Sequence, residues 1–172
     1  MKYFWILIYY LIGYNLPSRY FPLGKHFSKF RAFIVTRILK ENCGNNLEIE
    51  GKVLFGKFDD IKIGNNVQIN ERCRLRNVII GNDVMIAPEV YIIHSGHNFE
   101  KTDVSMRFQG EKFYPPTIIE DDVWIAARVI INAGKIIGRG SIIAAGSVVA
   151  KNIDPHTIAG GNPAKTIKKR EQ

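Results

Sequence analysis

An aliphatic residue recurs at every sixth position through much of the second half of the chain. The register holds for six successive repeats, whose first residues are Ile119, Ile125, Ile131, Ile137, Ile143 and Val149. The position that follows is mostly small. A period of six matches neither the turn of an α-helix nor the two-residue alternation of a strand. It predicts a solenoid, which is a chain built from short stacked repeats.

The same period is present in the first half, with one break in its register. It runs through three positions and resumes one residue short, at Ile63, Ile69 and Leu75 and then at Ile80, Ile86 and Ile92. Each repeat is expected to form a short strand whose aliphatic side chain points inward. A corner follows, where Gly or Asn accepts a positive φ. Three such faces would complete one coil, and stacked coils would bury a column of Ile and Val.

We therefore expect a mainly β chain in three parts. Residues 1–44 lack the repeat and are expected to form a helical, aromatic and basic N-terminal segment. Residues 45–160 are expected to form the coil, with an excursion loop at 98–116, and residues 161–172 a short basic tail.

Composition and charge narrow the possible functions. At 172 residues and 46% hydrophobic, the chain has the size of one domain with a core, and its two cysteines cannot form a disulfide scaffold. The net charge of +8 is concentrated near the ends, since residues 1–40 contain seven Lys or Arg and no acid. A nucleic-acid-binding protein usually spreads its bases over the docking face of the fold, so we expect no nucleic-acid partner.

Two histidines stand beside the long interruption of the repeat. His94 and His97 lie in the stretch Ile92-Ile-His-Ser-Gly-His-Asn, which leads into residues 98–116. A long loop that leaves a rigid scaffold is usually functional. The pKa of histidine suits a general base near neutral pH. We therefore expect the catalytic or binding site at this interruption.

Three further stretches carry a resemblance to a known family. They are Ile80-Gly-Asn-Asp-Val-Met-Ile-Ala-Pro, Asp122-Val-Trp-Ile and Ala159-Gly-Gly-Asn-Pro-Ala-Lys. Together with the period, they make residues 45–170 resemble the hexapeptide-repeat acyltransferases, which fold as a left-handed parallel β-helix. The resemblance is to the branch that contains galactoside and maltose acetyltransferases and bacterial exopolysaccharide O-acetyltransferases. It implies a homotrimer that uses acetyl-CoA and needs no metal.

The resemblance assigns the acceptor side of the site. In this family the general base is the His of a Ser/Thr-Gly-His stretch, which Ser95-Gly96-His97 matches. His94 would line the same cleft, or would itself be the base if the register is displaced. Asn70 matches an asparagine that binds polar groups of the substrate or steadies an oxyanion. The spacing from Asn70 to His97 departs by a few residues from that of the sugar enzymes.

The resemblance also assigns a binding site for acetyl-CoA, in a groove between two neighbouring coils. The residues are Trp124, Ala127, Ala145, Lys151, Lys165 and Lys168. The tryptophan and the two alanines match positions along the pantetheine arm, and the lysines match positions near the phosphates. A solvated basic tail is the alternative for the last two lysines. The sequence has no Ser or Cys in a nucleophile elbow, which favours direct transfer over a covalent acyl-enzyme.

The N-terminal segment supports two interpretations. Residues 3–14 combine five aromatic residues with Ile and Leu, and residues 25–40 combine helical spacing of apolar residues with Lys and Arg. This pattern is typical of a helix that lies on an anionic membrane surface. The alternative is a helical cap on the open end of the coil, which a solenoid requires. The longest apolar run is too short to cross a bilayer, so we expect a cytoplasmic protein, with peripheral membrane contact if the first interpretation holds.

The predicted function is transfer of an acetyl group from acetyl-CoA to a sugar hydroxyl of a bacterial surface polysaccharide or of its lipid-linked precursor. Two alternatives remain open. One is an O-acetyltransferase that modifies an antibiotic, since Gly160-Gly-Asn-Pro-Ala-Lys also occurs in such enzymes. The other is a hexapeptide scaffold without catalytic activity.

Overall fold

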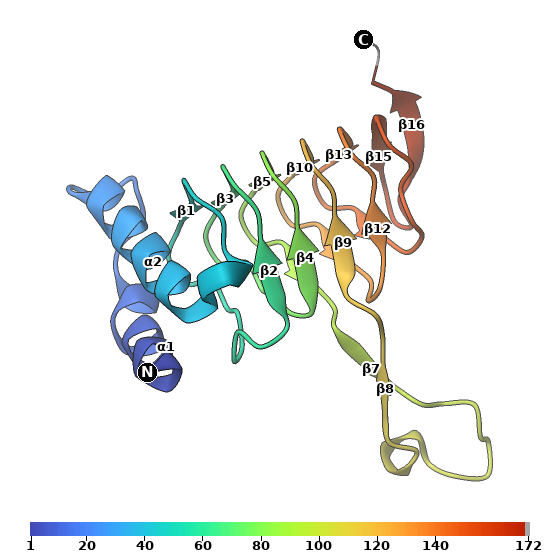
Figure 1. Cartoon of the computed structure of the whole chain (residues 1–172). Helices are drawn as coiled ribbons and strands as arrows, with labels where there is room; N and C mark the ends of the chain where they lie inside the picture. The colour runs from blue at the N-terminus through green and yellow to red at the C-terminus, as the bar shows by residue number, and fades with distance from the viewer. Residues whose placement is uncertain (171–172) are drawn as a thin grey trace.

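The computed structural model describes residues 1–170, in which two helices precede a long run of short strands (Figure 1). The α-helices are α1 (Lys2–Leu11) and α2 (Gly24–Leu39), and the 3-10 helices are η1 (Gly13–Asn15), η2 (Lys40–Asn42) and η3 (Met106–Phe108). The strands are β1 (Glu48–Ile49), β2 (Ile61–Ile63), β3 (Gln68–Ile69), β4 (Val78–Ile80), β5 (Met85–Ile86), β6 (Tyr91–Ile92), β7 (Ser95–His97), β8 (Glu111–Phe113), β9 (Thr117–Ile119), β10 (Trp124–Ile125), β11 (Ile130–Ile131), β12 (Ile136–Ile137), β13 (Ile142–Ile143), β14 (Val148–Val149), β15 (Thr157–Gly160) and β16 (Lys165–Lys169). The chain is mainly β with helices at its N-terminus, as the sequence predicts.

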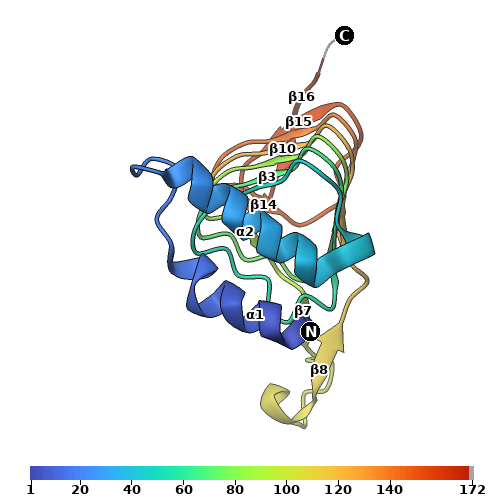
Figure 2. The ribbon, with the colours of Figure 1, turned by 60° about the vertical axis from the view of Figure 1, so that its left-hand side comes forward.

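Three sheets form the body of the molecule. The first has the order β1-β3-β5-β10-β13-β15-β16, the second β14-β11-β6 and the third β12-β9-β4-β2. All pairs in these sheets are parallel except β15 with β16. Viewed close to its long axis, the chain winds around a roughly triangular outline (Figure 2). This arrangement is consistent with the expected β-helix.

The strand register shows the length of one coil. Trp124 pairs with Ile142 in the first sheet and Ile130 with Val148 in the second, and in both cases the partners are 18 residues apart. Ile118 and Ile136 in the third sheet have the same separation. Three six-residue repeats therefore make one turn, as the period predicts.

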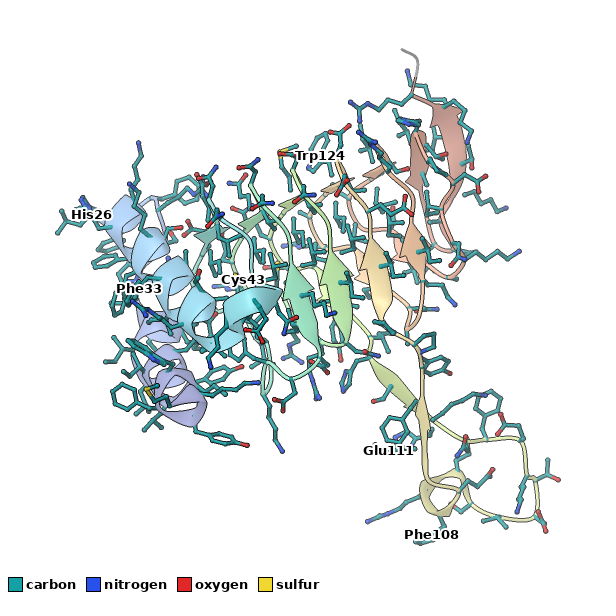
Figure 3. All side chains as sticks on the ribbon, in the orientation of Figure 1. His26, Phe33, Cys43, Phe108, Glu111 and Trp124 are labelled. Atoms are coloured by element: carbon teal, nitrogen blue, oxygen red, sulfur yellow. The ribbon has the colours of Figure 1, made fainter. Side chains whose placement is uncertain are left out.

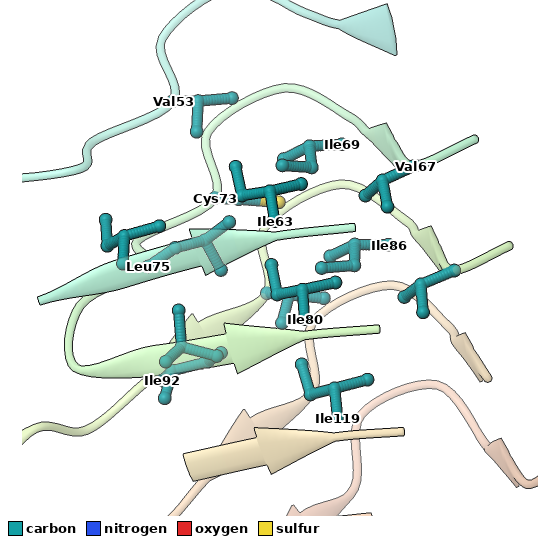
Figure 4. Packing of buried hydrophobic residues seen from close by; sticks show 14 of the residues in the cluster. Val53, Ile63, Val67, Ile69, Cys73, Leu75, Ile80, Ile86, Ile92 and Ile119 are labelled. Carbon is teal, nitrogen blue, oxygen red and sulfur yellow. The ribbon is translucent and has the colours of Figure 1, made fainter. Parts of the chain in front are cut away.

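Each repeat places one aliphatic side chain inside the coil. The first residues of the repeats, from Ile119 to Val149, are fully buried and stack along the axis with their counterparts in earlier coils (Figure 4). The corners between the faces need a left-handed residue, and positive φ angles recur every six residues, at Asp122, Arg128, Gly134, Gly140 and Gly146. Glycine, Asn and Asp tolerate this region best, which explains their place in the repeat.

The break in the period before Ile80 is absorbed by one short coil. Ile80 lies beside Ile63, only 17 residues earlier in the chain. Leu75 remains fully buried, but its neighbour Arg74 joins Leu54 and Tyr91 through isolated bridges instead of a strand. The missing residue thus shortens one face of the coil and leaves the next faces in register.

The excursion is a projecting arm with secondary structure of its own. Strands β7 and β8 pair in antiparallel fashion, with Ser95 opposite Phe113 and His97 opposite Glu111. The arm therefore begins before residue 98, and its return strand lies inside the segment expected to be a loop. It extends far from the coil, and Phe108 lies near its tip (Figure 3).

The two N-terminal helices cover the open end of the first coil (Figure 2). Tyr9 is fully buried, and its hydroxyl donates a hydrogen bond to the carbonyl of Val53 at 2.8 Å. Ile34, Val35 and Ile38 of α2 are buried in the same core. The cap interpretation of residues 1–44 is therefore confirmed, and their outer face is considered below.

Candidate active site

His97 occupies the root of the arm. It is the last residue of β7, and its side chain is exposed. It makes no side-chain hydrogen bond to any group of residues 1–170, so both ring nitrogens are available to a bound molecule. The root itself is fixed, because the side-chain amide of Asn77 donates to the carbonyl of Tyr114 at 2.9 Å. An imidazole on an anchored strand has the exposure that a general base requires.

His94 lies at the corner between the second and third sheets, where the arm leaves the coil. Ile92 pairs with Ile131, which pairs with Val149, so the residues two positions further along occupy equivalent corners. These residues are His94, Ala133 and Lys151. Since neighbouring strands lie about 5 Å apart, His94 and Lys151 are separated by roughly 10 Å along the stack. The structure therefore brings the arm, His94 and one of the predicted coenzyme lysines to a single corner.

Asn70, Ala127 and Ala145 gather at another corner, between the first and second sheets. The amide of Gly146 donates to the carbonyl of Ala127 at 2.9 Å, which stacks the two alanine turns on one another. Asn70 lies further down the same corner, where its side-chain amide donates to the carbonyl of Ile86 at 2.9 Å. One amide hydrogen of Asn70 is thus already engaged, and the other hydrogen and the oxygen remain for a ligand.

Trp124 and the two tail lysines belong to the first sheet. Trp124 points outward and is 45% exposed, between Met85 and Ile142 in neighbouring strands. Lys168 pairs with Ile158, which itself pairs with Ile142, so Lys168 lies in the same outward row as Trp124. Lys165 pairs with Gly160 in the same edge strand. The tail is therefore an ordered strand that extends the face carrying Trp124.

Within one chain, the predicted residues do not form a single cluster. The donor-side residues lie on the first sheet and at its corner with the second sheet. His94 and His97 lie at the far edge of the second sheet. Trp124 and Glu111, the partner of His97 across the arm, lie on opposite sides of the coil in Figure 3. A complete site therefore needs either a large movement or a second copy of the chain.

Two features near the predicted residues were not foreseen from the sequence. Glu89 and Arg128 form an ion pair at 2.7 Å, beside Ala127, and Arg72 lies 3.5 Å from the same carboxylate. The Arg128 guanidinium lowers the pKa of Glu89. The only sequence signal was the position of all three residues at corners of successive coils, where they adopt a positive φ.

The arm is the second unforeseen feature. Four of its large apolar side chains are more than half exposed, namely Phe99, Met106, Phe108 and Phe113. The tip is held by its own polar groups, since the side-chain amide of Gln109 donates to the carbonyls of Lys101 and Val104 at 2.7 Å. The arm is therefore an ordered structure that presents apolar surface to a partner.

The donor set of the site is of one chemical kind. Within residues 1–170, no group of three His, Cys, Asp or Glu side chains gathers in the arrangement of a metal site. The predicted residues offer an imidazole, amide groups, small corner residues and lysines. These groups can remove a proton from a hydroxyl and bind the phosphates and amide arm of a coenzyme.

A coil of six-residue repeats with an exposed histidine at the root of a long arm defines a class, the hexapeptide transferases. Residues 116–151 match the family described as bacterial transferase hexapeptide (six repeats). A putative acetyltransferase of Saccharomyces cerevisiae is 40% identical over 138 residues, which make up 78% of this chain and 69% of that protein. The chain therefore belongs to the hexapeptide-repeat acetyltransferase family, and the predicted enzyme class is confirmed.

Two further relatives have a known acceptor class or ligand. Galactoside O-acetyltransferase of Escherichia coli is 36% identical over 128 residues, which are 73% of this chain and 62% of that enzyme. A solved structure of galactoside acetyltransferase in complex with coenzyme A matches 99% of this chain and 80% of its own, at 27% identity and a TM-score of 0.77. The coenzyme bound in that structure is the one that the sequence predicts for this chain.

Proposed function

We propose that this chain transfers an acetyl group from acetyl-CoA to a sugar hydroxyl of a bacterial surface polysaccharide or of its lipid-linked precursor. The observation that carries the proposal is the exposed, unpartnered imidazole of His97 at the anchored root of the arm. Family membership supports the acetyl donor, and the similarity to a galactoside O-acetyltransferase supports a sugar hydroxyl as acceptor.

In the proposed reaction, His97 removes the proton of the acceptor hydroxyl as the oxygen attacks the thioester carbonyl carbon of acetyl-CoA. A C–O bond forms, and the carbonyl oxygen becomes an oxyanion, which the free N–H of Asn70 or a backbone amide stabilises. The C–S bond then breaks. The sulfur of coenzyme A leaves and takes back the proton from the His97 imidazolium, so the base returns to its starting state.

The coenzyme is proposed to lie along the corner that carries Ala127 and Ala145, where small side chains leave the backbone amides open. Trp124 would pack beside its pantetheine arm. Lys151, Lys165 and Lys168 would neutralise its phosphates as point charges. The ordered tail strand supports this role for Lys165 and Lys168, because it holds both lysines on the edge of the first sheet.

We also propose that the enzyme is a homotrimer of left-handed coils. The donor residues and His97 lie at different edges of the second sheet, so a neighbouring copy can supply the missing wall of each groove. Two outward rows of apolar side chains support this assembly. One row contains Tyr91, Ile130 and Val148 on the second sheet, and the other contains Ile79, Ile118 and Ile136 on the third.

We propose that the reaction takes place in the cytoplasm, at the membrane when the acceptor is lipid-linked. Neither helix of the described chain has the length and apolar character needed to cross a bilayer. Contact with the membrane would therefore be peripheral.

The role of His97 can be tested by measuring thiol release from acetyl-CoA in the presence of a galactoside or glucoside acceptor. We expect His97→Ala to lower kcat by about 10²–10⁴-fold, since a general base contributes on this order. His94→Ala is the matched control and should lower kcat less. Circular dichroism and coenzyme A binding should be unchanged in both variants.

Two outcomes would contradict this proposal. A His97→Ala enzyme with full activity would move the base to His94 or elsewhere. An enzyme that acetylates chloramphenicol or a macrolide but no sugar would favour the antibiotic alternative. A chain that binds coenzyme A but releases no thiol with any acceptor would favour a scaffold.

A further inference from the structure

The N-terminal cap has an outer face that packs against nothing in the described chain. On α2 this face carries Lys25, Lys29, Phe33, Arg37 and Lys40, which recur at helical spacing while Ile34, Val35 and Ile38 face the coil. His26 and Phe33 are visible on the side of the helices turned away from the strands (Figure 3). The cap therefore has one face that stabilises the coil and another that is free.

The free face is far more apolar than solvation requires. On α1, Tyr3, Phe4, Leu7 and Leu11 lie on one side of the helix and are 57–80% exposed. In the segment that joins the helices, Tyr20 is 82% exposed, Phe21 63% and Leu23 68%. The terminal cap of a solenoid normally turns a polar face to water. A continuous apolar surface of this kind indicates a binding surface.

The same face carries a net positive charge. Three of the seven bases in residues 1–40 are neutralised by the coil: Lys2 by Asp59 at 2.7 Å, and Arg19 and Arg31 by Glu50. The other four have no acidic partner within residues 1–170, and they are Lys25, Lys29, Arg37 and Lys40. All four are on the outer face of α2 or at its end, and no acid lies between them.

Two grooves run along either side of Phe33 and combine cations with an apolar wall. One, of about 490 Å³, lies between α2 and residues 44–48 and is lined by Lys25 and Lys29. The other, of about 570 Å³, lies between α1 and α2 and is lined by Trp5, Arg37 and Lys40. Lysine and arginine in such grooves can bind phosphate groups while the aromatic rings contact acyl chains.

We propose that the outer face of the cap, formed by α1, residues 17–23 and α2, docks on an anionic lipid bilayer. The proposal commits to a bilayer because the two properties of the face match the two layers that a bilayer presents. The four free bases match a negatively charged headgroup layer, and the exposed Tyr, Phe and Leu side chains match the interface beneath it. A nucleic acid would pair with the bases but would leave these apolar side chains in water.

This inference deepens the proposed function when the acceptor is lipid-linked, because docking would hold the enzyme at the surface where such an acceptor lies. It does not depend on the chemistry, since lipid binding can be measured without any substrate. Conversely, transfer to a soluble sugar can be measured without lipid. The two proposals can therefore fail separately.

The test is flotation of the full-length protein with vesicles of phosphatidylcholine, alone or mixed with phosphatidylglycerol. We expect the protein to float with the anionic vesicles at low salt and much less at high salt. Each base near the surface contributes about fivefold to affinity, so Lys29→Glu combined with Lys40→Glu should weaken binding by roughly 25-fold or more. Lys101→Glu combined with Arg139→Glu makes the same change in net charge away from the cap and should leave binding unchanged.

A second variant tests the apolar contribution. Phe4→Ser combined with Leu7→Ser should reduce the binding that persists at high salt, because apolar insertion is not screened by ions. Thiol release with a soluble sugar should be unchanged in both cap variants, which shows that they are folded. The proposal is overturned if the wild-type protein does not float with anionic vesicles, if the two charge variants lose affinity equally, or if the cap variants abolish self-association instead of lipid binding.

Discussion

Arg31 shows how far the role of a single residue can depart from its appearance in the sequence. In the chain it is one of seven bases in a segment without acids, but in the structure it is fully buried. Its Nε donates to the carbonyl of Ile49 at 2.7 Å, and its two terminal nitrogens reach the carbonyl of Pro17 and the carboxylate of Glu50. Burial lowers the pKa of Arg31, and the Glu50 carboxylate opposes this effect. The pair fastens α2 and the segment before it to the first coil.

We expect Glu50→Ala to destabilise the protein by about 3–5 kcal/mol, because it would leave the Arg31 guanidinium buried without a counter-charge. The measurement is the free energy of unfolding in urea. Glu48→Ala is the matched control, since Glu48 is an exposed partner of Arg19 and should contribute at most about 1 kcal/mol. Equal losses in the two variants would contradict a buried electrostatic lock.

At the scale of elements, the coil could be predicted and the arm could not. The coil is encoded locally, because each repeat contains its own inward aliphatic residue and its own corner residue. Even the short coil before Ile80 was visible as a missing residue. The arm depends on the pairing of β7 with β8, which are separated by the whole tip, and neither strand has the repeat that would reveal it.

The arm also contains a pH-sensitive contact. Lys112 donates to the Glu100 carboxylate at 2.9 Å and is the main reason why the pKa of Glu100 falls to about 2. Because the folded-state pKa lies below the ordinary value for Glu, the pair supports the arm above that ordinary value. Its contribution is lost as pH falls towards 2. We expect a carboxyl titration by NMR to place Glu100 well below its usual range.

Lys112→Ala should return the Glu100 pKa towards its ordinary value, whereas Lys101→Ala should leave it unchanged. The pair is fully exposed, so the free energy of unfolding of the coil should be the same in both variants. A normal Glu100 titration in the wild-type protein would show that the arm does not hold this contact in solution.

At the scale of the whole molecule, the separation of His97 from the donor residues makes the assembly part of the chemistry. The sequence assigned these residues to one site but could not show that they lie at different edges of a coil. That separation depends on how many residues each face contains and on which corner releases the arm. The residue types were therefore predictable, while their division between two copies of the chain required the structure.

We expect the protein in solution to have three times the mass of one chain, as measured by light scattering. Ile130→Glu combined with Ile136→Glu should produce monomers, since both side chains are 37% exposed on the outer apolar rows and would place charges inside the interface. Thiol release should fall with the mass. Ile167→Glu alters an exposed aliphatic residue of the tail strand and should leave the trimer intact. A fully active monomer would exclude the proposed shared site.

The way in which the arm joins the coil separates two kinds of change that this protein could undergo. Ile92 still pairs with Ile131, although 39 residues lie between them where a plain coil has 18. The amide of Ile93 bonds to Ile131 just before the chain departs, and the amide of Thr117 bonds to Asn77 as soon as it returns. The inserted residues thus leave the stacking undisturbed. Arms of other lengths could be exchanged at this junction, so that the choice of acceptor could diversify while the coenzyme groove is inherited intact.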